Sequence, residues 1–447
     1  MAGSDRGGRQ GRSVITRELD RSIFRLAIPA LGALAIDPLL TLVDTAFVAR
    51  LGVPELAALG VDTAILGFAF FGFNFLAYAT TPLVAQALGR GDRAIARRWV
   101  GDALLLAVIL GVAATILIEL LAPWIVGLMG ATGEVTGPAL AYLRIRVIAA
   151  PAVLIVVAGH GAFRGHQDTR TPLIVAAGVN GINLVLAPIF IFALSLGVEG
   201  AAMATVIAQV VGAVWFLRLI RKRRLADRPR RFRESVPTLL ALGKSGALIT
   251  LRTGVLLLAF VVAASAATRI GAESIAAHQV VLQVWLIAAM IADSLAIAGQ
   301  AMVGTSAGSG DRQGVEEVSR RLLFWGAAVG VVMTGALLVG APLLGPLVGS
   351  AQVAALVVAT IPVVAWMMPV AAPLFVADGI FFGLLALWSI VASTATGAVL
   401  AIGLITLTPM GDTLNGIWWA IAAMLVARSL VFVFAYRRAV SVVAVRS

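Results

Sequence analysis

Two aspartates lie inside one long apolar stretch near the start of the chain. Asp37 and Asp44 are seven residues apart, which places them two turns apart on one face of a helix. A carboxyl group shielded from water favours its protonated form, and a cation that binds the carboxylate displaces that proton. This pair could therefore exchange protons for a cationic compound. A fixed ion pair, for example with Arg252, is the alternative interpretation of either residue.

Other polar residues in apolar stretches could support such a site. Asn180 and Asn183 could donate hydrogen bonds to a substrate or to the second of these aspartates, or could join neighbouring helices. Arg252 and Asp378 fall within predicted spanning segments, where a charge needs a partner or a polar cavity. Asp62 is predicted to lie near the outer interface, where a charge costs less.

The stretch that holds the two aspartates also contains two prolines, Pro29 and Pro38. Each proline removes a backbone hydrogen bond and permits a bend. An acidic helix that can bend is suited to link protonation to a change of shape.

The composition is typical of a chain that lies in a lipid bilayer. Of its 447 residues, 60% are hydrophobic and 13% are charged, and the mean hydropathy is +1.01. A soluble domain of this length needs more polar surface.

Many apolar runs reach the roughly 20 residues with which a helix crosses hydrocarbon. We predict an all-α integral membrane protein with twelve transmembrane helices. Their predicted limits are 23–49, 56–88, 99–121, 139–162, 172–196, 199–220, 239–268, 277–308, 318–346, 353–383, 386–408 and 414–436.

The net charge of +12 is unevenly placed along the chain. Most of the 34 Lys and Arg residues fall in the terminal segments and in alternate loops, which is the positive-inside pattern. We therefore predict that both termini are cytoplasmic and that the charge does not bind nucleic acid. The predicted domains are a tail (1–22), a six-helix lobe (23–220), a basic linker (221–238), a second six-helix lobe (239–436) and a tail (437–447).

The two lobes repeat each other in sequence. The segment 50–52 matches 269–271, and 89–93 matches 308–312, both at an offset of 219 residues. Six spans in each lobe imply a pseudo-symmetry axis along the membrane normal and a central cavity between the lobes. In the second matched loop, glycine is predicted to end one helix and Asp92 to cap the next.

Other functional classes lack the residues they need. The chain has no cysteine and no GxxxxGK[ST] nucleotide-binding loop. His160, His166 and Asp168 could suggest a metal site, but the basic loop around the last two favours a solvated segment. No serine–histidine arrangement suggests hydrolysis. We expect neither an enzyme nor a protein with a cofactor or a bound metal.

Several short motifs, taken with their order and spacing, point to a known family. They are Ala27-Ile28-Pro29, Leu42-Val43-Asp44-Thr45-Ala46, Arg50-Leu51-Gly52, Leu56-Ala57-Ala58, Gly89-Arg90-Gly91-Asp92, Phe163-Arg164-Gly165, Asp168-Thr169-Arg170-Thr171-Pro172 and Gly200-Ala201-Ala202. Nearly the whole chain, with its twofold repeat, resembles the multidrug and toxic compound extrusion (MATE) family, in its DinF-like branch.

The resemblance implies a V-shaped pair of six-helix lobes and efflux coupled to a cation. It implies that Asp44 is the central coupling residue and that Pro29 accompanies bending of the first helix. An aspartate of the tenth helix is functional in another branch of the family, and Asp378 is similar in position. DinF-like relatives can carry Asn-x-x-x-Asp-Pro in the fifth helix. Here Asn183 is followed by Ala187 at the acid position, which argues against a Na⁺ site or proton network using that acid.

We predict a proton-coupled antiporter that exports amphipathic, cationic organic compounds by alternating access, with Asp44 as the shared site for proton and substrate. A flippase for lipid-linked precursors is the nearest alternative, and a Na⁺-coupled exporter is another. A channel or receptor is disfavoured because the halves differ and no pore-lining segment repeats. The expected setting is a bacterial inner membrane, where the chain is a multi-pass monomer in contact with lipid and a small organic substrate.

Overall fold

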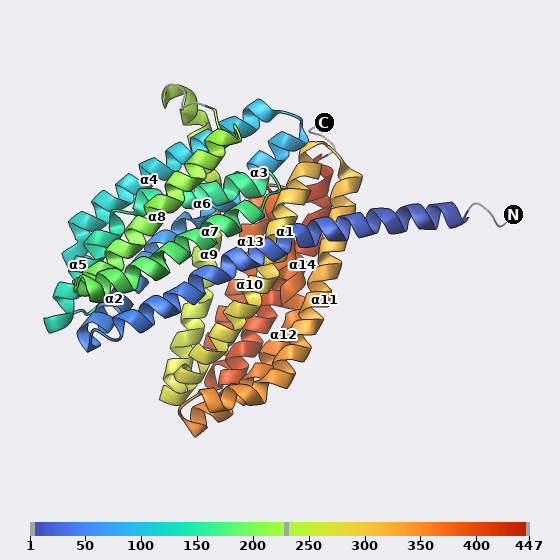
Figure 1. Ribbon diagram of the computed structural model, residues 1–447. Helices are drawn as coiled ribbons and strands as arrows, with labels where there is room; N and C mark the ends of the chain where they lie inside the picture. The colour runs from blue at the N-terminus through green and yellow to red at the C-terminus, as the bar shows by residue number, and fades with distance from the viewer. Residues whose placement is uncertain (1–4, 228–231, 444–447) are drawn as a thin grey trace. The chain divides into compact units, whose positions relative to one another are not determined.

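The computed structural model describes residues 5–227 and 232–443, and every regular element in these two ranges is a helix (Figure 1). The first half contains α1 (Asp5–Val48), α2 (Val53–Phe71), α3 (Phe75–Gly89), α4 (Arg93–Leu128), α5 (Thr136–Val147), α6 (Ala150–Gly165), α7 (Arg170–Pro188) and α8 (Gly197–Lys222). The second half contains α9 (Phe232–Ile270), α10 (Ala272–Gly308), α11 (Arg312–Leu344), α12 (Ala351–Gly383), α13 (Leu387–Leu407) and α14 (Leu414–Ser441). In the described ranges, 11 helical segments are long and apolar enough to cross a membrane, and the bent pair α5–α6 makes a twelfth. The predicted all-α membrane fold with twelve spans is confirmed.

Several spans depart from the single helices that the hydrophobic runs predict. A 3₁₀ turn at Gly72–Asn74 joins α2 to α3, and a π-helical turn at Ile189–Ala193 extends α7. The helices α5 and α6 meet at 50°, where Pro151 lies in the first turn of α6 and cannot donate a backbone hydrogen bond to α5. The first helix begins at Asp5, inside the predicted tail.

The helices form two compact units. The N-terminal unit comprises Gly32–Gly246, and the C-terminal unit comprises Met1–Leu31 together with Ala247–Ser447. The first part of α1 thus belongs to the C-terminal unit, where the carboxylate of Asp20 accepts hydrogen bonds from the guanidinium of Arg321 on α11. The boundaries of the units therefore differ from those of the predicted lobes.

The beginning of α9 belongs to the N-terminal unit, although it lies inside the predicted linker (221–238). Ser235 donates a 2.7 Å hydrogen bond to the carboxylate of Asp102 on α4. Arg98 donates one of 2.7 Å to the backbone carbonyl of Glu234. These contacts hold the start of α9 against α4, so the linker between the halves is shorter than predicted.

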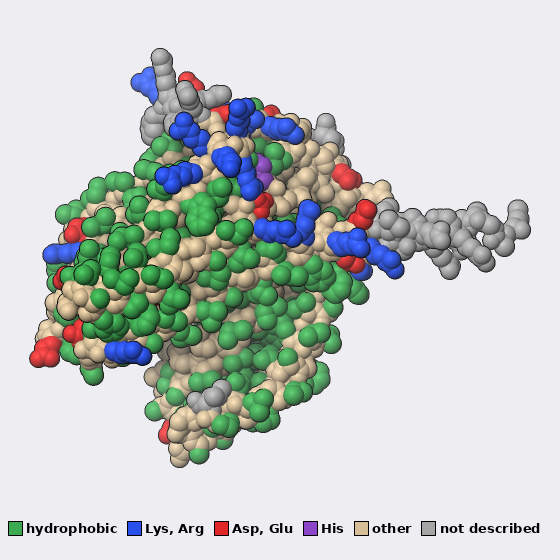
Figure 2. Space-filling view, viewed as in Figure 1, with side chains coloured by type: hydrophobic (Ala, Val, Ile, Leu, Met, Phe, Trp, Pro, Cys, Tyr) green, Lys and Arg blue, Asp and Glu red, His purple; other side chains and the backbone are tan. Residues whose placement is uncertain are grey.

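Large apolar side chains lie exposed along the helices. Leu120 of α4 is 75% exposed, and Val433 of α14 is 68% exposed. Figure 2 shows apolar side chains over the long sides of α4 and α8, with Lys and Arg gathered at the end of α8, whose last turn carries Arg221 and Lys222. An apolar surface of this extent is suited to lipid tails, and the basic end to the water beside them.

Two loops that are 219 residues apart share one backbone geometry. Gly91 has a φ of +75° and Gly310 a φ of +73°, a left-handed conformation that favours glycine. Asp92 and Asp311 each accept a 2.8 Å hydrogen bond from the backbone N–H three residues later. Each aspartate therefore caps the helix that follows it, as the sequence predicts.

The repeat extends to the hydrogen bonds between helices. The hydroxyl of Thr115 on α4 lies 2.9 Å from the backbone carbonyl oxygen of Val147 at the end of α5. The hydroxyl of Thr334 on α11 lies 2.8 Å from that of Ala365 on α12. An equivalent threonine therefore anchors the equivalent neighbouring span in each unit.

Glycines allow the equivalent helices of each unit to approach closely. A Cβ atom at Gly161 would lie 3.0 Å from the backbone oxygen of Ala77, where α6 crosses α3. A Cβ atom at Gly379 would collide with the backbone oxygen of Ala296, where α12 crosses α10. Both crossings require a residue without a side chain.

The variant Gly379→Ala should lower the melting temperature of the purified protein, because its methyl group must push α10 and α12 apart. Overpacking of this kind costs about 1–3 kcal/mol. Gly335→Ala on α11 is the matched control, since no atom beyond the nearby backbone of its own helix and its chain neighbours lies within 4 Å of its added Cβ. Alanine is favoured over glycine in helices, so this control should melt at the wild-type temperature or above it. Equal thermal unfolding curves for the two variants would contradict the close crossing.

Candidate functional site

A polar cavity of about 290 Å³ lies within the N-terminal unit, between α1, α2, α5, α7 and α8. Its polar lining residues are Asp37, Thr41, Asp44, Thr45, Thr63, Tyr142, Arg146, Asn180, Asn183, Thr205 and Gln209. Two acids and two amides that the sequence singles out, Asp37, Asp44, Asn180 and Asn183, therefore line one cavity. Its volume is just below the roughly 300–1,000 Å³ that ligand pockets occupy.

The face of α1 that lines the cavity carries both aspartates, as their spacing predicts. Thr41 donates a 3.0 Å hydrogen bond to the backbone carbonyl of Asp37, and Thr45 donates one of 2.7 Å to that of Thr41. These bonds satisfy the threonines within the helix. Asp37 is exposed, whereas Asp44 is half-buried.

The two asparagines of α7 bond different acids. Asn180 donates a 2.9 Å hydrogen bond to Oδ1 of Asp37. Asn183 lies 3.5 Å from Oδ2 of Asp44, at the outer limit of a hydrogen bond, and donates a shorter bond of 2.9 Å to the hydroxyl of Thr205. Oδ1 of Asp44 is buried and accepts no hydrogen bond from any residue that the structure describes. This carboxylate therefore has unused bonding capacity inside the cavity.

Two further charged residues lie at or near this site, Arg146 in its lining and Asp62 close to Arg146. Arg146 lines the cavity from α5, and its positive charge attracts both Asp44 and Asp62. The side chain of Asp62 is 0% exposed, so other residues of the protein cover it. The helix begins at Val53, so Asp62 lies more than two turns inside α2, which packs against α5. An arginine inside a predicted span was the available signal for this part of the site.

The position of the missing acid in α7 is apolar. Ala187 is buried, and it belongs to a cluster of buried residues that includes Ile191 and Val198. The departure from the pattern described above therefore leaves hydrocarbon at this position.

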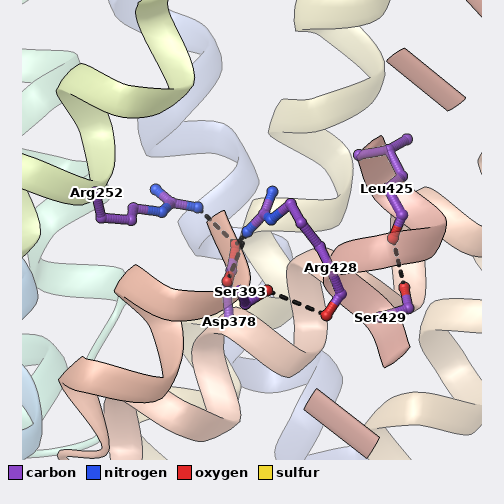
Figure 3. Close-up of polar contacts among 6 residues, drawn as sticks. All are labelled: Arg252, Asp378, Ser393, Leu425, Arg428 and Ser429. Atoms are coloured by element: carbon purple, nitrogen blue, oxygen red, sulfur yellow. Dashed lines mark hydrogen bonds and ion pairs between the residues drawn. The ribbon is translucent and has the colours of Figure 1, made fainter. Parts of the chain in front are cut away.

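The two charged candidates of the C-terminal unit meet each other. Asp378 on α12 is 4% exposed and accepts hydrogen bonds of 2.9 and 2.8 Å from Nη2 of Arg428 on α14. Arg252 on α9 donates a third, of 2.6 Å. Figure 3 shows the two guanidinium groups converging on this one carboxylate. Arg252, a possible partner for the acids of α1 from the sequence alone, thus pairs with Asp378.

Pro29 lies close to the point where α1 passes from one unit to the other. The C-terminal unit ends its share of α1 at Leu31, two residues after Pro29. The helix is continuous through this proline, whose ring removes the backbone hydrogen bond to the carbonyl of Arg25. The backbone of α1 therefore has one fewer constraint close to this boundary.

The loop between α6 and α7 makes local bonds. The Nδ1 atom of His166 lies 2.8 Å from the backbone carbonyl oxygen of Ala162. The carboxylate of Asp168 accepts hydrogen bonds of 2.6 Å from both Thr171 and Arg223. Although partial burial acts to raise it, these bonds hold the pKa of Asp168 below its ordinary value. The bonds from Thr171 and Arg223 account for this residue without a metal ion.

Twelve spans in two repeated sets, with a charged cavity inside one set, define a multi-pass membrane protein of the secondary-transporter class. The chain matches the MatE family model over residues 29–189 and 251–407. It belongs to the MATE family, as the motifs predict, and members of this family are multidrug and toxin efflux transporters rather than enzymes.

Known relatives occur in plants and bacteria. The chain is 33% identical to Protein DETOXIFICATION 44, chloroplastic, of Arabidopsis thaliana over 384 residues, which is 82% of this chain and 72% of that protein. It is 28% identical to DNA damage-inducible protein F of Escherichia coli (strain K12) over 429 residues, which is 94% and 92% of the two chains. The Vibrio cholerae MATE transporter VcmN in its bent form has the same fold, with a TM-score of 0.89 and 20% identity over 96% and 99% of the chains.

The bonds of Asp168 should make a pH-dependent contribution to stability. Because its folded-state pKa is lowered, the contribution is complete above the unfolded-state pKa of about 3.9 and disappears as the pH falls through the folded-state value. Asp168→Asn should therefore lower the stability at pH 7 by about 0.5–1 kcal/mol, since the pair is partly exposed. Thermal unfolding in detergent between pH 7 and pH 3 measures this difference, and Glu134→Gln is an exposed control. A difference that grows on acidification would contradict the assignment.

Asp378→Asn should destabilise the C-terminal unit strongly, because Arg428 is 1% exposed and loses its negative partner. Breaking a buried ion pair in this way costs about 3–5 kcal/mol. The exposed Asp412→Asn serves as the control and should melt like the wild type. If both variants unfold at the wild-type temperature, the ion cluster does not hold the unit together.

Proposed function

We propose that the protein exports amphipathic, cationic organic compounds in exchange for protons, with Asp44 as the site that both occupy in turn. The observation that carries this proposal is the position of Asp44, half-buried at the cavity with one carboxylate oxygen unbonded among the described residues. A charge in this setting is costly until a cation or a proton neutralises it. Because either one suffices, each excludes the other, and this competition is what antiport requires.

The charge and lining of the cavity favour a cation with an apolar body. Asp37 and Asp44 line the cavity and Asp62 lies near it, against the single positive charge of Arg146. When all three acids are ionised, negative charge is in excess. Apolar side chains such as Leu66 contribute the rest of the lining, which is suited to the hydrocarbon part of a drug-like molecule.

The same cavity favours protons over Na⁺. A Na⁺ ion needs several oxygen ligands. Beside Asp44, Asn183 presents its amide nitrogen and Ala187 supplies no second carboxylate, which leaves Asp37 and uncharged groups such as the threonine hydroxyls. The guanidinium of Arg146 adds repulsion. A proton needs one carboxylate oxygen, and Asp44 has one available.

The C-terminal unit argues against a flippase for phosphate-linked lipids. Such a substrate needs cationic groups that can bind phosphate. Arg252 and Arg428 already donate to Asp378 at 2.6 to 2.9 Å, so phosphate binding would have to displace that carboxylate.

We further propose a bacterial inner membrane as the setting, with the protein acting as a monomer by alternating access. Its likeness to the Escherichia coli relative supports a bacterial membrane, although the Arabidopsis relative is named as chloroplastic. Basic residues at the end of α8 and in the terminal segments support cytoplasmic termini.

Asp44→Asn should reduce proton-driven efflux from proteoliposomes by at least about tenfold, because the amide cannot exchange a proton for a cation. Asp44→Glu keeps a carboxyl group and should retain part of the activity. The assay applies a pH gradient and a Na⁺ gradient separately to an amphipathic cation such as ethidium. Wild-type rates in the folded Asp44→Asn protein would exclude the role of Asp44, and efflux driven by Na⁺ alone would exclude proton coupling.

A further inference from the structure

Asp62 is a buried acid to which the proposed mechanism assigns no role. It is 0% exposed on α2, and neither carboxylate oxygen accepts a hydrogen bond from the part of the chain that the structure describes. An ionised carboxylate in such surroundings is very unfavourable. Asp62 therefore requires either a proton or a nearby cation.

The nearby cation is Arg146, which Asp62 shares with Asp44. The positive charge of this guanidinium acts on both acids. Its Nε and Nη1 atoms are buried and donate no hydrogen bond to any described residue, so they are available to a carboxylate. Arg146 is thus within electrostatic range of two acids, Asp44 on α1 and Asp62 on α2.

Few other titratable groups lie near Asp62. Tyr142, one turn before Arg146 on α5, is close enough to interact with both acids. On the surrounding elements, Glu119 of α4 and Arg144 of α5 pair with each other at 3.8 Å and are about half exposed. Glu134, in the turn before α5, is exposed. Asp37 of α1 lines the same cavity, but its carboxylate is bonded by Asn180. The charge balance at Asp62 therefore depends chiefly on Arg146 and Asp44.

We propose that Asp62 is a second proton-coupling residue, which shares Arg146 with Asp44 so that the cluster stays neutral throughout the exchange. Without cargo, one acid holds a proton and the other pairs with Arg146. When a monovalent cation binds at Asp44, the proton leaves and Arg146 pairs with Asp62. One positive charge replaces another, and no uncompensated charge remains in the membrane. This inference rests on the proposed antiport at Asp44.

Proton release on binding tests the proposal. Purified protein in weakly buffered detergent is titrated with tetraphenylphosphonium, and the protons released are counted. The wild type should release about one proton per bound cation. In Asp62→Asn, Arg146 neutralises Asp44 without a proton, so release should disappear and affinity should fall about tenfold. Glu55→Gln, an acid on the same helix outside the cavity, should behave like the wild type.

The double variant Arg146→Gln/Asp62→Asn gives the sharpest outcome. With the guanidinium also removed, Asp44 again needs a proton when no cargo is bound, so proton release should return. A purely structural Asp62 predicts no such restoration. Proton release in Asp62→Asn equal to that of the wild type would overturn the proposal.

A third variant keeps the test decisive if Asp62→Asn does not fold. In Arg146→Gln both acids lose their cation and hold protons more tightly, so release should require a higher pH than in the wild type. An unchanged pH profile would contradict the shared guanidinium. Asp44→Asn distinguishes failure of the proposed antiport from failure of the role of Asp62. If Asp44→Asn still releases protons, the proposed function fails. If Asp62→Asn releases protons but Asp44→Asn does not, only the role of Asp62 fails.

Discussion

A carboxylate inside a membrane must be matched by a positive charge or by a proton, and the polar interior of both units follows from this constraint. In the C-terminal unit, Asp378 is matched by Arg428 and Arg252 and is nearly inaccessible to solvent. In the N-terminal unit, Asp44 and Asp62 have one arginine between them. In the first arrangement both carboxylate oxygens are bonded by arginine, whereas the second is short of positive charge. That shortage is what a proton or a cationic compound can fill.

The two units differ in charge while their helix framework is repeated. The capped loops at Asp92 and Asp311, and the threonines Thr115 and Thr334, recur at an offset of 219 residues with nearly equal distances. Close helix crossings at glycine recur in the same way. Because packing is fixed by these small residues and backbone contacts, the charged side chains could diverge between the halves without changing how the helices pack. A shared framework thus carries an ion cluster in one unit and an open cavity in the other.

Sequence patterns predicted the spans, the repeat, the capped loops and the acidic face of α1, because each depends on local spacing or on hydrophobic run length. They did not pair Arg252 with Asp378, which lies 126 residues away. Such pairs depend on which face of each helix turns inward, and a uniformly apolar run does not encode this. The burial of Asp62 was missed for the same reason. The shares of α1 and α9 in the two units also depend on tertiary packing rather than on hydropathy.

The division of α1 between the units has a consequence for biosynthesis. Its first part packs with Leu322 of α11, Val376 of α12 and Val440 of α14, and Asp20 bonds Arg321, which is 301 residues further along the chain. A ribosome makes this segment well before these partners, which lie in the second half of the sequence. The segment must therefore wait in the bilayer while hundreds of residues are inserted. Assembly of the C-terminal unit is then a long-range step, in which an early segment docks onto helices made much later.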